Sequence, residues 1–339
     1  MSNTSAATIG SFFSTPSSSL LPGNQRPPWE NGEKVSYVQS GRQALASIGR
    51  IYASEGRDEL LIPDYLCNSM LEGFDLSHWE LRTYRINSEL MIDTEDLLSK
   101  VGDPPRTVVL SATYFGNEPS LRHRDRMKDL QDIGVRIIED ETHRIFGELN
   151  QVGDVAIASL RKLLPVADGA YIRGDLDFET SQDASSIGWM AMDEKASGNI
   201  ENAKSLYAQG NQEISSRTFD PTLPTSRSLN VIEALDYEFI RNRRRSNAHY
   251  LRLNLKKRQY LEIVVNAEIP SHLLVRIPEA KFAQKKLADR GVFCPIHWPQ
   301  PEHLSNLQWR HDLLSIPIDH RYDREDMQRI IDDLDSIYA

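Results

Sequence analysis

Between residues 43 and 172 the sequence alternates short apolar segments with longer amphipathic segments. Strands are expected over 59–63, 81–86, 107–116, 135–140, 154–157 and 170–172. Helices are expected over 43–52, 94–101 and 121–133. Short apolar strands that alternate with helices predict an α/β fold, with a mostly parallel central sheet and helices on both faces. In a sheet of this kind, ligands bind at the carboxyl ends of the strands.

The rest of the sequence divides the chain into three parts. Residues 1–33 are rich in Ser, Thr, Pro and Gly, and we expect an N-terminal arm that is partly disordered, with the apolar segment 9–13 able to dock. Residues 34–235 are expected to form a large ligand-binding domain, and residues 236–339 a smaller C-terminal α+β domain.

The second half has a looser pattern. We expect surface helices and a long loop over 175–226, one long helix over 229–255, strands over 273–277 and 291–293, and helices over 279–290 and 324–338. The long helix carries Arg241, Arg243, Arg244 and Arg245, which are expected on a solvated helix face.

Charge and cysteine content limit the functional classes. The 339 residues carry a formal net charge of -10, which disfavours nucleic acid and anionic lipid as partners. No apolar run reaches the roughly 18 residues of a membrane span, and no secretory signal is recognised. Two widely separated cysteines indicate a reducing compartment, and no cluster has the spacing of a zinc site. We therefore expect a cytoplasmic protein without a metal.

Two charged residues lie where predicted strands end. Asp140 ends the strand over 135–140, and Lys162 lies just past the next strand, where the chain turns back. A lysine in low-dielectric surroundings loses its proton more readily and can form a Schiff base. A carboxylate on the neighbouring strand can pair with a protonated pyridine nitrogen.

The start of the helix over 43–52 adds a third feature. Gly41 and Arg42 precede this helix, and a helix N-terminus binds phosphate through its free backbone N–H groups. Ser159 can add a further contact. A lysine, a carboxylate and a phosphate site are the requirements of pyridoxal 5'-phosphate (PLP). Taken singly, Lys162 also fits a surface lysine and Asp140 a helix or turn cap.

These segments, in this order, resemble the DegT/DnrJ/EryC1/StrS aminotransferase family, the sugar aminotransferases, which are PLP-dependent enzymes of fold type I. The resemblance covers roughly residues 40–320. The segments that carry it are Ser-Gly-Arg-Gln-Ala-Leu at 40–45, Leu-Ile-Pro-Asp-Tyr at 61–65, Val-Leu-Ser-Ala-Thr-Tyr-Phe-Gly at 109–116, Ile-Glu-Asp-Glu-Thr-His at 138–143, Ser-Leu-Arg-Lys at 159–162 with Asp-Gly at 168–169, and Leu-Leu-Ser-Ile-Pro-Ile at 313–318.

The resemblance implies a role for each matching residue. Lys162 would bind the cofactor covalently and move protons, Asp140 would pair with the pyridine nitrogen, and His143 would lie near the ring. The phosphate would be held by Gly41, Arg42 and Gln43, with Ser159 beside them. The family is dimeric with shared active sites, so Tyr114, Arg227, His297 and Trp298 are assigned to the substrate or to the partner subunit.

The sequence departs from the family at three places. The position of the aromatic ring that stacks on the cofactor is Cys67, with Tyr65 and Asn68 nearby. The usual Ser-Phe-His-x-x-Lys is shortened to Ser-Leu-Arg-Lys at 159–162, and the usual Gly-x-Asn-x-Arg is Pro-Thr-Ser-Arg at 224–227. The presence of Lys162 disfavours the lysine-less dehydratase branch of the family.

Three hypotheses about function follow. The first is a PLP-dependent aminotransferase that moves an amino group from glutamate or a similar donor to a keto group, with a nucleotide-linked sugar as one candidate acceptor. The second keeps PLP but catalyses condensation, replacement or decarboxylation of an amino acid. The third is a scaffold kept for binding or regulation without turnover. Lys162 and Asp140 together favour the first two.

Overall fold

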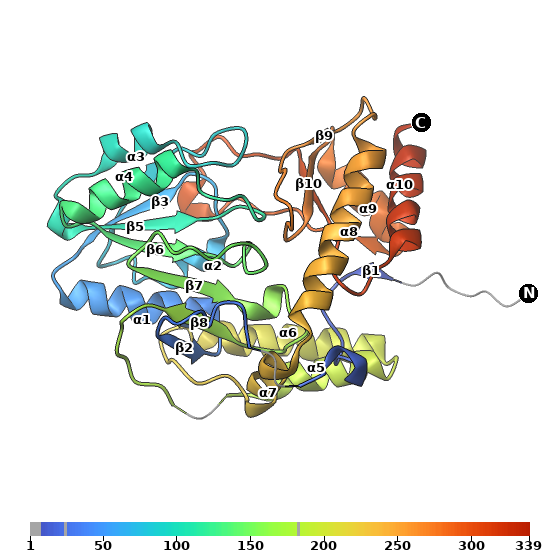
Figure 1. Ribbon diagram of the computed structural model, residues 1–339, viewed down its shortest axis with the longest axis horizontal. Coiled ribbons are helices and arrows are strands. Elements are labelled where there is room, and N and C mark those ends of the chain that lie inside the picture. The colour runs from blue at the N-terminus through green and yellow to red at the C-terminus, as the bar shows by residue number, and fades with distance from the viewer. Residues whose placement is uncertain (1–7, 24–25, 182–183) are drawn as a thin grey trace, which may run out of the picture.

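The computed structural model describes residues 8–23, 26–181 and 184–339 (Figure 1). Its centre is a seven-stranded sheet. In spatial order the strands are β2 (Val35–Val38), β8 (Ala170–Arg173), β7 (Val155–Ser159), β6 (Arg136–Asp140), β5 (Thr107–Ala112), β3 (Glu59–Pro63) and β4 (Glu80–Tyr84). The five strands from β7 to β4 run parallel, whereas β8 is antiparallel to both of its neighbours. The predicted mostly parallel α/β fold is thus confirmed.

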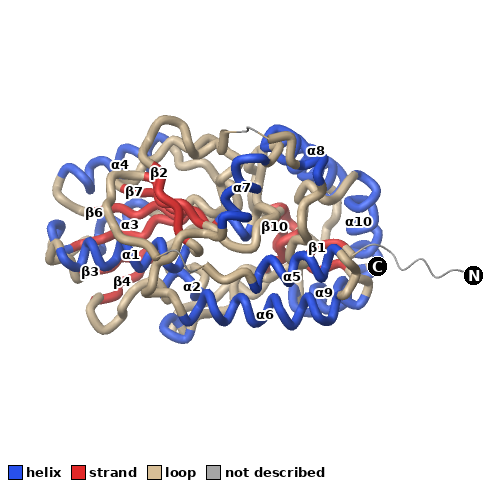
Figure 2. The backbone as a smooth tube through the Cα atoms, turned by 90° about the horizontal axis from the view of Figure 1, so that it is seen from below, coloured by secondary structure: helices blue, strands red, loops and turns tan. Residues whose placement is uncertain are grey.

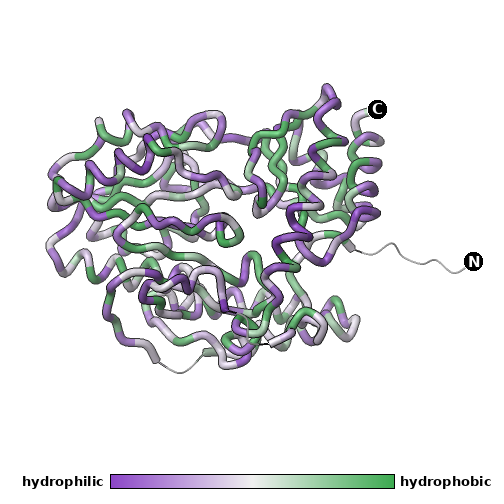
Figure 3. Tube along the Cα trace, viewed as in Figure 1, coloured by the Kyte–Doolittle hydropathy of each residue, from purple (hydrophilic) through white to green (hydrophobic). Residues whose placement is uncertain are grey.

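Burial on both faces explains why these segments form strands. Every residue of β3 and β7 is buried, as expected for strands inside a sheet that is covered on two sides. Figure 1 shows α3 and α4 on one side of the sheet and α1 on the other, and Figure 3 shows hydrophobic residues along the central strands. The helices of the large domain are α1 (Gly41–Ser54), α2 (Asn68–Leu71), α3 (Thr94–Lys100), α4 (Leu121–Asp132), α5 (Ile187–Ala196), α6 (Ile200–Ser216) and α7 (Ser226–Ala234).

A smaller layered unit follows the large domain. Its antiparallel sheet has the order β12 (Leu313–Ile316), β10 (Leu273–Arg276) and β9 (Glu262–Ile263). The helices α8 (Tyr237–Leu255), α9 (Ala280–Asp289) and α10 (Arg324–Tyr338) pack with it around a second core (Figure 1). The described residues also contain four 3₁₀ helices: η1 (Ser18–Leu20), η2 (Pro104–Arg106), η3 (Leu160–Lys162) and η4 (Glu302–Leu304).

The single long helix expected over 229–255 is wrong, because the structure has two helices there. Helix α7 ends at Ala234, and α8 begins at Tyr237. The side chain of Asp236 accepts a hydrogen bond from the backbone N–H of Phe239, so it caps a new helix. Asp is a preferred N-cap residue, and this local signal outweighs the apolar spacing that continues through the break.

The N-terminal arm packs on both domains where the structure describes it. Strand β1 (Ile9–Gly10) pairs in parallel with β11 (Val292–Phe293) of the small unit. Further along, Thr15 donates a hydrogen bond to Asp193 on α5, and the Trp29 side chain is fully buried. Docking of the apolar segment 9–13 is therefore observed. Residues 1–7 and 24–25 of the arm lie outside the described residues.

No helix within the described ranges is both long enough and apolar enough to cross a membrane. Figure 2 shows α5 and α6 side by side on the outside of the molecule, in keeping with the expected surface helices.

Substitution of Trp29 tests whether the N-terminal arm is part of the folded core. Its ring stacks on Tyr171 at a centroid distance of 5.2 Å, and its Nε1 donates to the Tyr37 hydroxyl at 2.9 Å. Trp29→Ala is expected to lower the free energy of unfolding by about 3–5 kcal/mol, because it leaves a large cavity. Chemical denaturation measures this change. Phe219→Ala, at a side chain that is 48% exposed, is the control and should change stability by less than about 0.5 kcal/mol.

Candidate active site

The carboxyl edge of the central sheet meets the N-terminus of α1 around a small cavity of about 40 Å³. Asp140 ends β6, Ser159 ends β7, and Lys162 follows in η3. All three line this cavity together with Gly41 and Arg42. The strand order places β6 and β7 next to each other, so the predicted lysine and carboxylate lie at one edge of the sheet.

The contact between α1 and β7 favours a glycine. A Cβ atom at Gly41 would lie 3.2 Å from the Cβ of Ser159, which is a tight approach. Ser40 caps α1 by accepting a hydrogen bond from the N–H of Gln43. In the first helical turn the N–H groups of Gly41 and Arg42 have no intrahelical acceptor, so they offer two donors beside the Ser159 hydroxyl.

Alternation along β6 separates Asp140 from its acidic neighbours. Successive side chains of a strand point to opposite faces, so Glu139 and Glu141 face away from Asp140. The Oδ1 atom of Asp140 accepts a hydrogen bond from the N–H of Thr142 at 2.8 Å, which fixes the carboxylate. Thr142 also accepts a hydrogen bond from the N–H of Ser159, and this bond ties the ends of β6 and β7 together.

A buried ionic network lies on the other face of β6. Glu141 accepts hydrogen bonds from Arg144 at 3.1 Å, from Arg173 at 2.6 Å and from the Tyr171 hydroxyl at 2.9 Å. Glu139 accepts a further bond from Arg144 at 2.6 Å. The side chains of both arginines are fully buried. Each buried charge is thus paired, and the network holds the chain rigidly on either side of Asp140.

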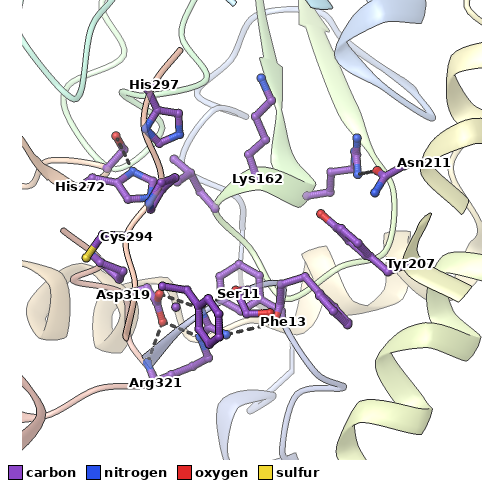
Figure 4. A pocket seen from close by; sticks show the side chains of 18 of the residues that line it. Ser11, Phe13, Lys162, Tyr207, Asn211, His272, Cys294, His297, Asp319 and Arg321 are labelled. Atoms are coloured by element: carbon purple, nitrogen blue, oxygen red, sulfur yellow. Dashed lines mark hydrogen bonds and ion pairs between the residues drawn. The ribbon is translucent and has the colours of Figure 1, made fainter. Parts of the chain in front are cut away.

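Lys162 also lines a second, larger cavity of about 690 Å³ between the two domains. Figure 4 shows its side chain extending away from Phe13, with His297 and His272 on one side and Tyr207 and Asn211 on the other. Cys67, His143, His297 and Trp298, all singled out from the sequence, line the same cavity. The lysine therefore belongs to the lining of both cavities.

Three histidines form one wall of the larger cavity. The rings of His143, His272 and His297 lie 4.9–6.4 Å apart by their centroids, and the Nδ1 of His143 is 2.8 Å from the Ser271 hydroxyl. Burial lowers the pKa of His143 and His297 well below the usual value, and it lowers the pKa of His272 to about 3. The three rings are neutral at pH 7, so they supply neutral hydrogen-bonding groups.

The charged groups around the larger cavity are mostly cationic. Five cationic side chains line it, against the single carboxylate of Asp319. That carboxylate is bound by Arg321 at 2.7 Å, so it does not offset the other four. The cationic side chains are Arg161, Lys162, Arg244, Lys285 and Arg321. A cavity of this charge attracts anionic ligands, although the whole chain is acidic.

Several residues singled out from the sequence have other contacts. The Gln43 amide donates to the carbonyls of Arg217 and Asp220 and accepts from two backbone N–H groups, so its side chain has no polar atom left for a phosphate. Asn68 donates to Glu72 at 2.8 Å on the surface. Neither residue is part of the lining of the two cavities.

The remaining predicted residues also lie outside the two cavity walls. Tyr114 is buried, and its hydroxyl donates to the carbonyl of Tyr65. The Tyr65 hydroxyl in turn donates to the carbonyl of His297. Arg227 forms an ion pair with Asp193 at 2.7 Å and lies over the Trp189 ring. The two tyrosines thus support the cavity wall from behind, and Arg227 is on the surface of the protomer.

The structure adds site residues that sequence reasoning missed. Arg161 lines both cavities and donates to Asn211 at 2.8 Å. Arg244 was expected on a solvated helix face, but it is 1% exposed and lines the larger cavity, because α8 passes between the two domains. The arm contributes Gly10 to Phe13 to the same wall. The apolar pattern of the arm was the one available signal for these last residues.

Within residues 8–23, 26–181 and 184–339, no group of three or more His, Cys, Asp or Glu side chains is arranged to hold a metal ion.

The depressed pKa of His272 makes stability depend on pH. At His272 the folded protein binds fewer protons than the unfolded chain does. The neutral ring therefore makes its full contribution to the free energy of unfolding above about pH 6.5, and this contribution is lost as the pH falls toward 3. His272→Gln is expected to reduce the fall in unfolding free energy between pH 6 and pH 4 by up to about 1.4 kcal/mol per pH unit. Denaturation curves across this range measure the slope. His249→Gln, at an exposed position of α8, should leave it unchanged.

Comparisons with known proteins give structural but no sequence-level relatives. No protein-family model matches the sequence, and no curated protein matches it. Among solved structures, a DegT DnrJ EryC1 StrS aminotransferase from Brucella abortus is similar with a TM-score of 0.62 and 16% identity, covering 90% of this chain and 86% of that one. NtdA from Bacillus subtilis, solved with bound cofactor PMP, is similar with a TM-score of 0.65 and 16% identity over 93% of this chain and 78% of that one.

DesI, solved in the presence of its TDP-sugar product, is similar with a TM-score of 0.65 and 15% identity, covering 94% of this chain and 86% of that one. Because these matches extend over both domains, they concern the whole architecture. The fold implied by the sequence resemblance is thereby confirmed, and this chain has the fold of these aminotransferases.

Proposed function

We propose that the protein is a PLP-dependent aminotransferase that transfers an amino group from an amino acid, with glutamate as the donor, to a keto group on a nucleotide-linked sugar. The observation that carries the proposal is that Lys162, Asp140, Ser159 and the α1 N-terminus line one cavity, and that Lys162 also lines the larger cavity. The fold that the protein shares with aminotransferases, one solved with bound cofactor PMP and one solved in the presence of its TDP-sugar product, supports the proposal.

The residues present fit PLP. A phosphate requires donors and a close backbone approach, which the Gly41 and Arg42 N–H groups, the Ser159 hydroxyl and the missing Cβ of Gly41 provide. Asp140 offers a fixed carboxylate for the ring nitrogen. Cys67, which lines the larger cavity, stands where the related family has a stacking ring, so the ring would meet a thiol instead.

When bound, PLP supplies an electron sink for charge that develops at the reacting carbon of the substrate. The chain supplies the acid-base groups. Lys162 lines both cavities, and its amine would act as the base that removes a proton from the substrate carbon and as the acid that returns a proton in the next step. Asp140 would keep the ring nitrogen of PLP protonated, and the neutral His143 and His297 rings would orient polar groups without adding charge.

The proposed substrates agree with the charge of the larger cavity. Both glutamate and a nucleotide-linked sugar are anionic, and the cationic side chains of the cavity attract anions. The two cysteines are unpaired, which suits work in the cytoplasm. We further propose a homodimer in which Arg227 reaches the active site of the partner, because in its own protomer it lies on the surface beside Asp193.

Cofactor binding through Lys162 has a spectroscopic signature. Protein reconstituted with PLP is expected to absorb near about 420 nm and to lose this band with borohydride. Lys162→Ala should abolish the band and lower turnover at least about 10³-fold, because the proton-transfer group is gone. Lys204→Ala, on the exposed side of α6, is the control. A Lys162→Ala protein that keeps the band would contradict the assignment.

The same spectrum separates the three hypotheses. If glutamate removes the absorption near about 420 nm and a keto sugar nucleotide restores it, the aminotransferase hypothesis is supported. A change with another amino acid but none with glutamate favours a different PLP reaction, and binding of PLP without any change favours a scaffold without turnover.

Mixing two inactive variants tests the shared active site. If Arg227 completes the site of the partner subunit, a Lys162→Ala protomer combined with an Arg227→Ala protomer restores one complete site in each mixed dimer. Since half of the dimers are mixed after random exchange, about a quarter of wild-type activity is expected. Steady-state turnover after subunit exchange measures it. Full activity of Arg227→Ala alone, or no recovery on mixing, would rule out this role.

A further inference from the structure

Arg244 is a buried cation whose guanidinium is not bound to a carboxylate where the structure describes the chain. It lies on α8 and is 1% exposed. Among the described residues no carboxylate lies within ion-pair distance of it, and its Nε has no hydrogen-bond partner. The nearby Asp319 is bound by Arg321 instead. Burying a charge without a partner costs several kcal/mol, so a bound anion would offset this cost.

Two hydrogen bonds fix the guanidinium in the cavity wall. Its Nη1 donates to the Ser271 carbonyl at 2.9 Å, and its Nη2 donates to the Leu163 carbonyl at 3.1 Å. A guanidinium carries five N–H donors, so three are not used by these two hydrogen bonds, and the buried Nε is one of the three. The Phe146 ring lies 4.6 Å from the guanidinium carbon and covers one face. The group is thus held rigidly, with unused donors, at the wall of the larger cavity.

The position of Arg244 indicates which part of a substrate it would contact. Leu163, whose carbonyl it binds, directly follows Lys162. The charge of Arg244 also contributes to the low pKa of His272, which lines the same cavity. An anionic group bound here is therefore close to the atom on which the lysine acts. A carboxylate attached directly to the reacting carbon meets this requirement, whereas the diphosphate of a nucleotide-linked sugar lies several bonds further away.

We propose that Arg244 binds the α-carboxylate of the amino-acid donor through the planar fork of its guanidinium. The proposal rests on the proposed function, since it names the donor subsite of that reaction. A guanidinium matches a carboxylate with two parallel hydrogen bonds, and a lysine ammonium cannot reproduce this geometry. Arg244 is thus a substrate-binding residue, and the sugar-nucleotide acceptor occupies other parts of the cavity.

The first test measures binding without turnover. Calorimetry with glutarate, a dicarboxylate that cannot react, is carried out on the PLP-reconstituted protein and its variants. Arg244→Gln is expected to raise the Kd of glutarate about 10- to 100-fold, and Arg244→Lys by less, because a charge-assisted bond is lost. Arg243→Gln, one position along the same helix and outside the cavity wall, is the matched control. Inorganic phosphate binding should not change in any variant.

Each other outcome overturns the proposal. Equal losses of glutarate and phosphate binding would make Arg244 a general oxyanion site for the acceptor. An equal loss of glutarate affinity in Arg243→Gln would indicate a long-range electrostatic effect and not a direct contact. If the wild-type protein does not bind glutarate, the proposed donor subsite is wrong. If Arg244→Gln does not fold, as judged by circular dichroism, Arg244→Lys decides the question, and an unchanged Kd in it contradicts a forked contact.

The second test uses turnover and separates this inference from the proposed function. With glutamate as the donor, Arg244→Gln should raise KM about 10- to 100-fold with a smaller change in kcat. With isopropylamine, an amine donor that lacks a carboxylate, the ratio of wild-type to variant rates should stay near 1. An equal loss with both donors would indicate a structural role. If the wild type transfers no amino group at all, the proposed function fails, while the glutarate measurement still tests Arg244.

Discussion

The ionic network behind β6 is the constraint on which the site depends. Glu139 and Glu141 are locked by Arg144 and Arg173 on one face of the strand, and the alternation of a strand then leaves Asp140 on the other face. Removing one partner from such a buried network costs about 3–5 kcal/mol, because a charge is left uncompensated. The fold therefore fixes the carboxylate before any ligand arrives, and Lys162 lies in η3, directly after the neighbouring strand β7.

Sequence reasoning found the parts of the site that depend on local patterns. Asp140, Ser159 and Lys162 were recognised because strand ends and turns are visible as changes in apolar spacing, and parallel strands bring their carboxyl ends to one edge. The Gly41 contact with Ser159 also agrees with the expected helix start. The central sheet was predicted nearly strand by strand for the same reason.

What the sequence did not reveal depends on contacts between distant segments. Nothing local distinguishes Arg244 from Arg243, yet the first is buried between two domains and the second is partly exposed. The Gln43 amide donates its hydrogen bonds to the carbonyls of Arg217 and Asp220, which are more than 170 residues away in the sequence. The cationic cavity inside an acidic chain likewise arises only when α8, η3 and the small unit come together.

The central claim is that Lys162, Asp140 and the α1 N-terminus hold one PLP molecule. A crystal structure of the PLP-reconstituted protein tests it most directly. Continuous electron density from the Lys162 Nζ to the cofactor is expected, with the phosphate beside Gly41 and Ser159 and the ring nitrogen within hydrogen-bonding distance of Asp140. A cofactor bound elsewhere, or a ring nitrogen facing away from Asp140, would contradict the account.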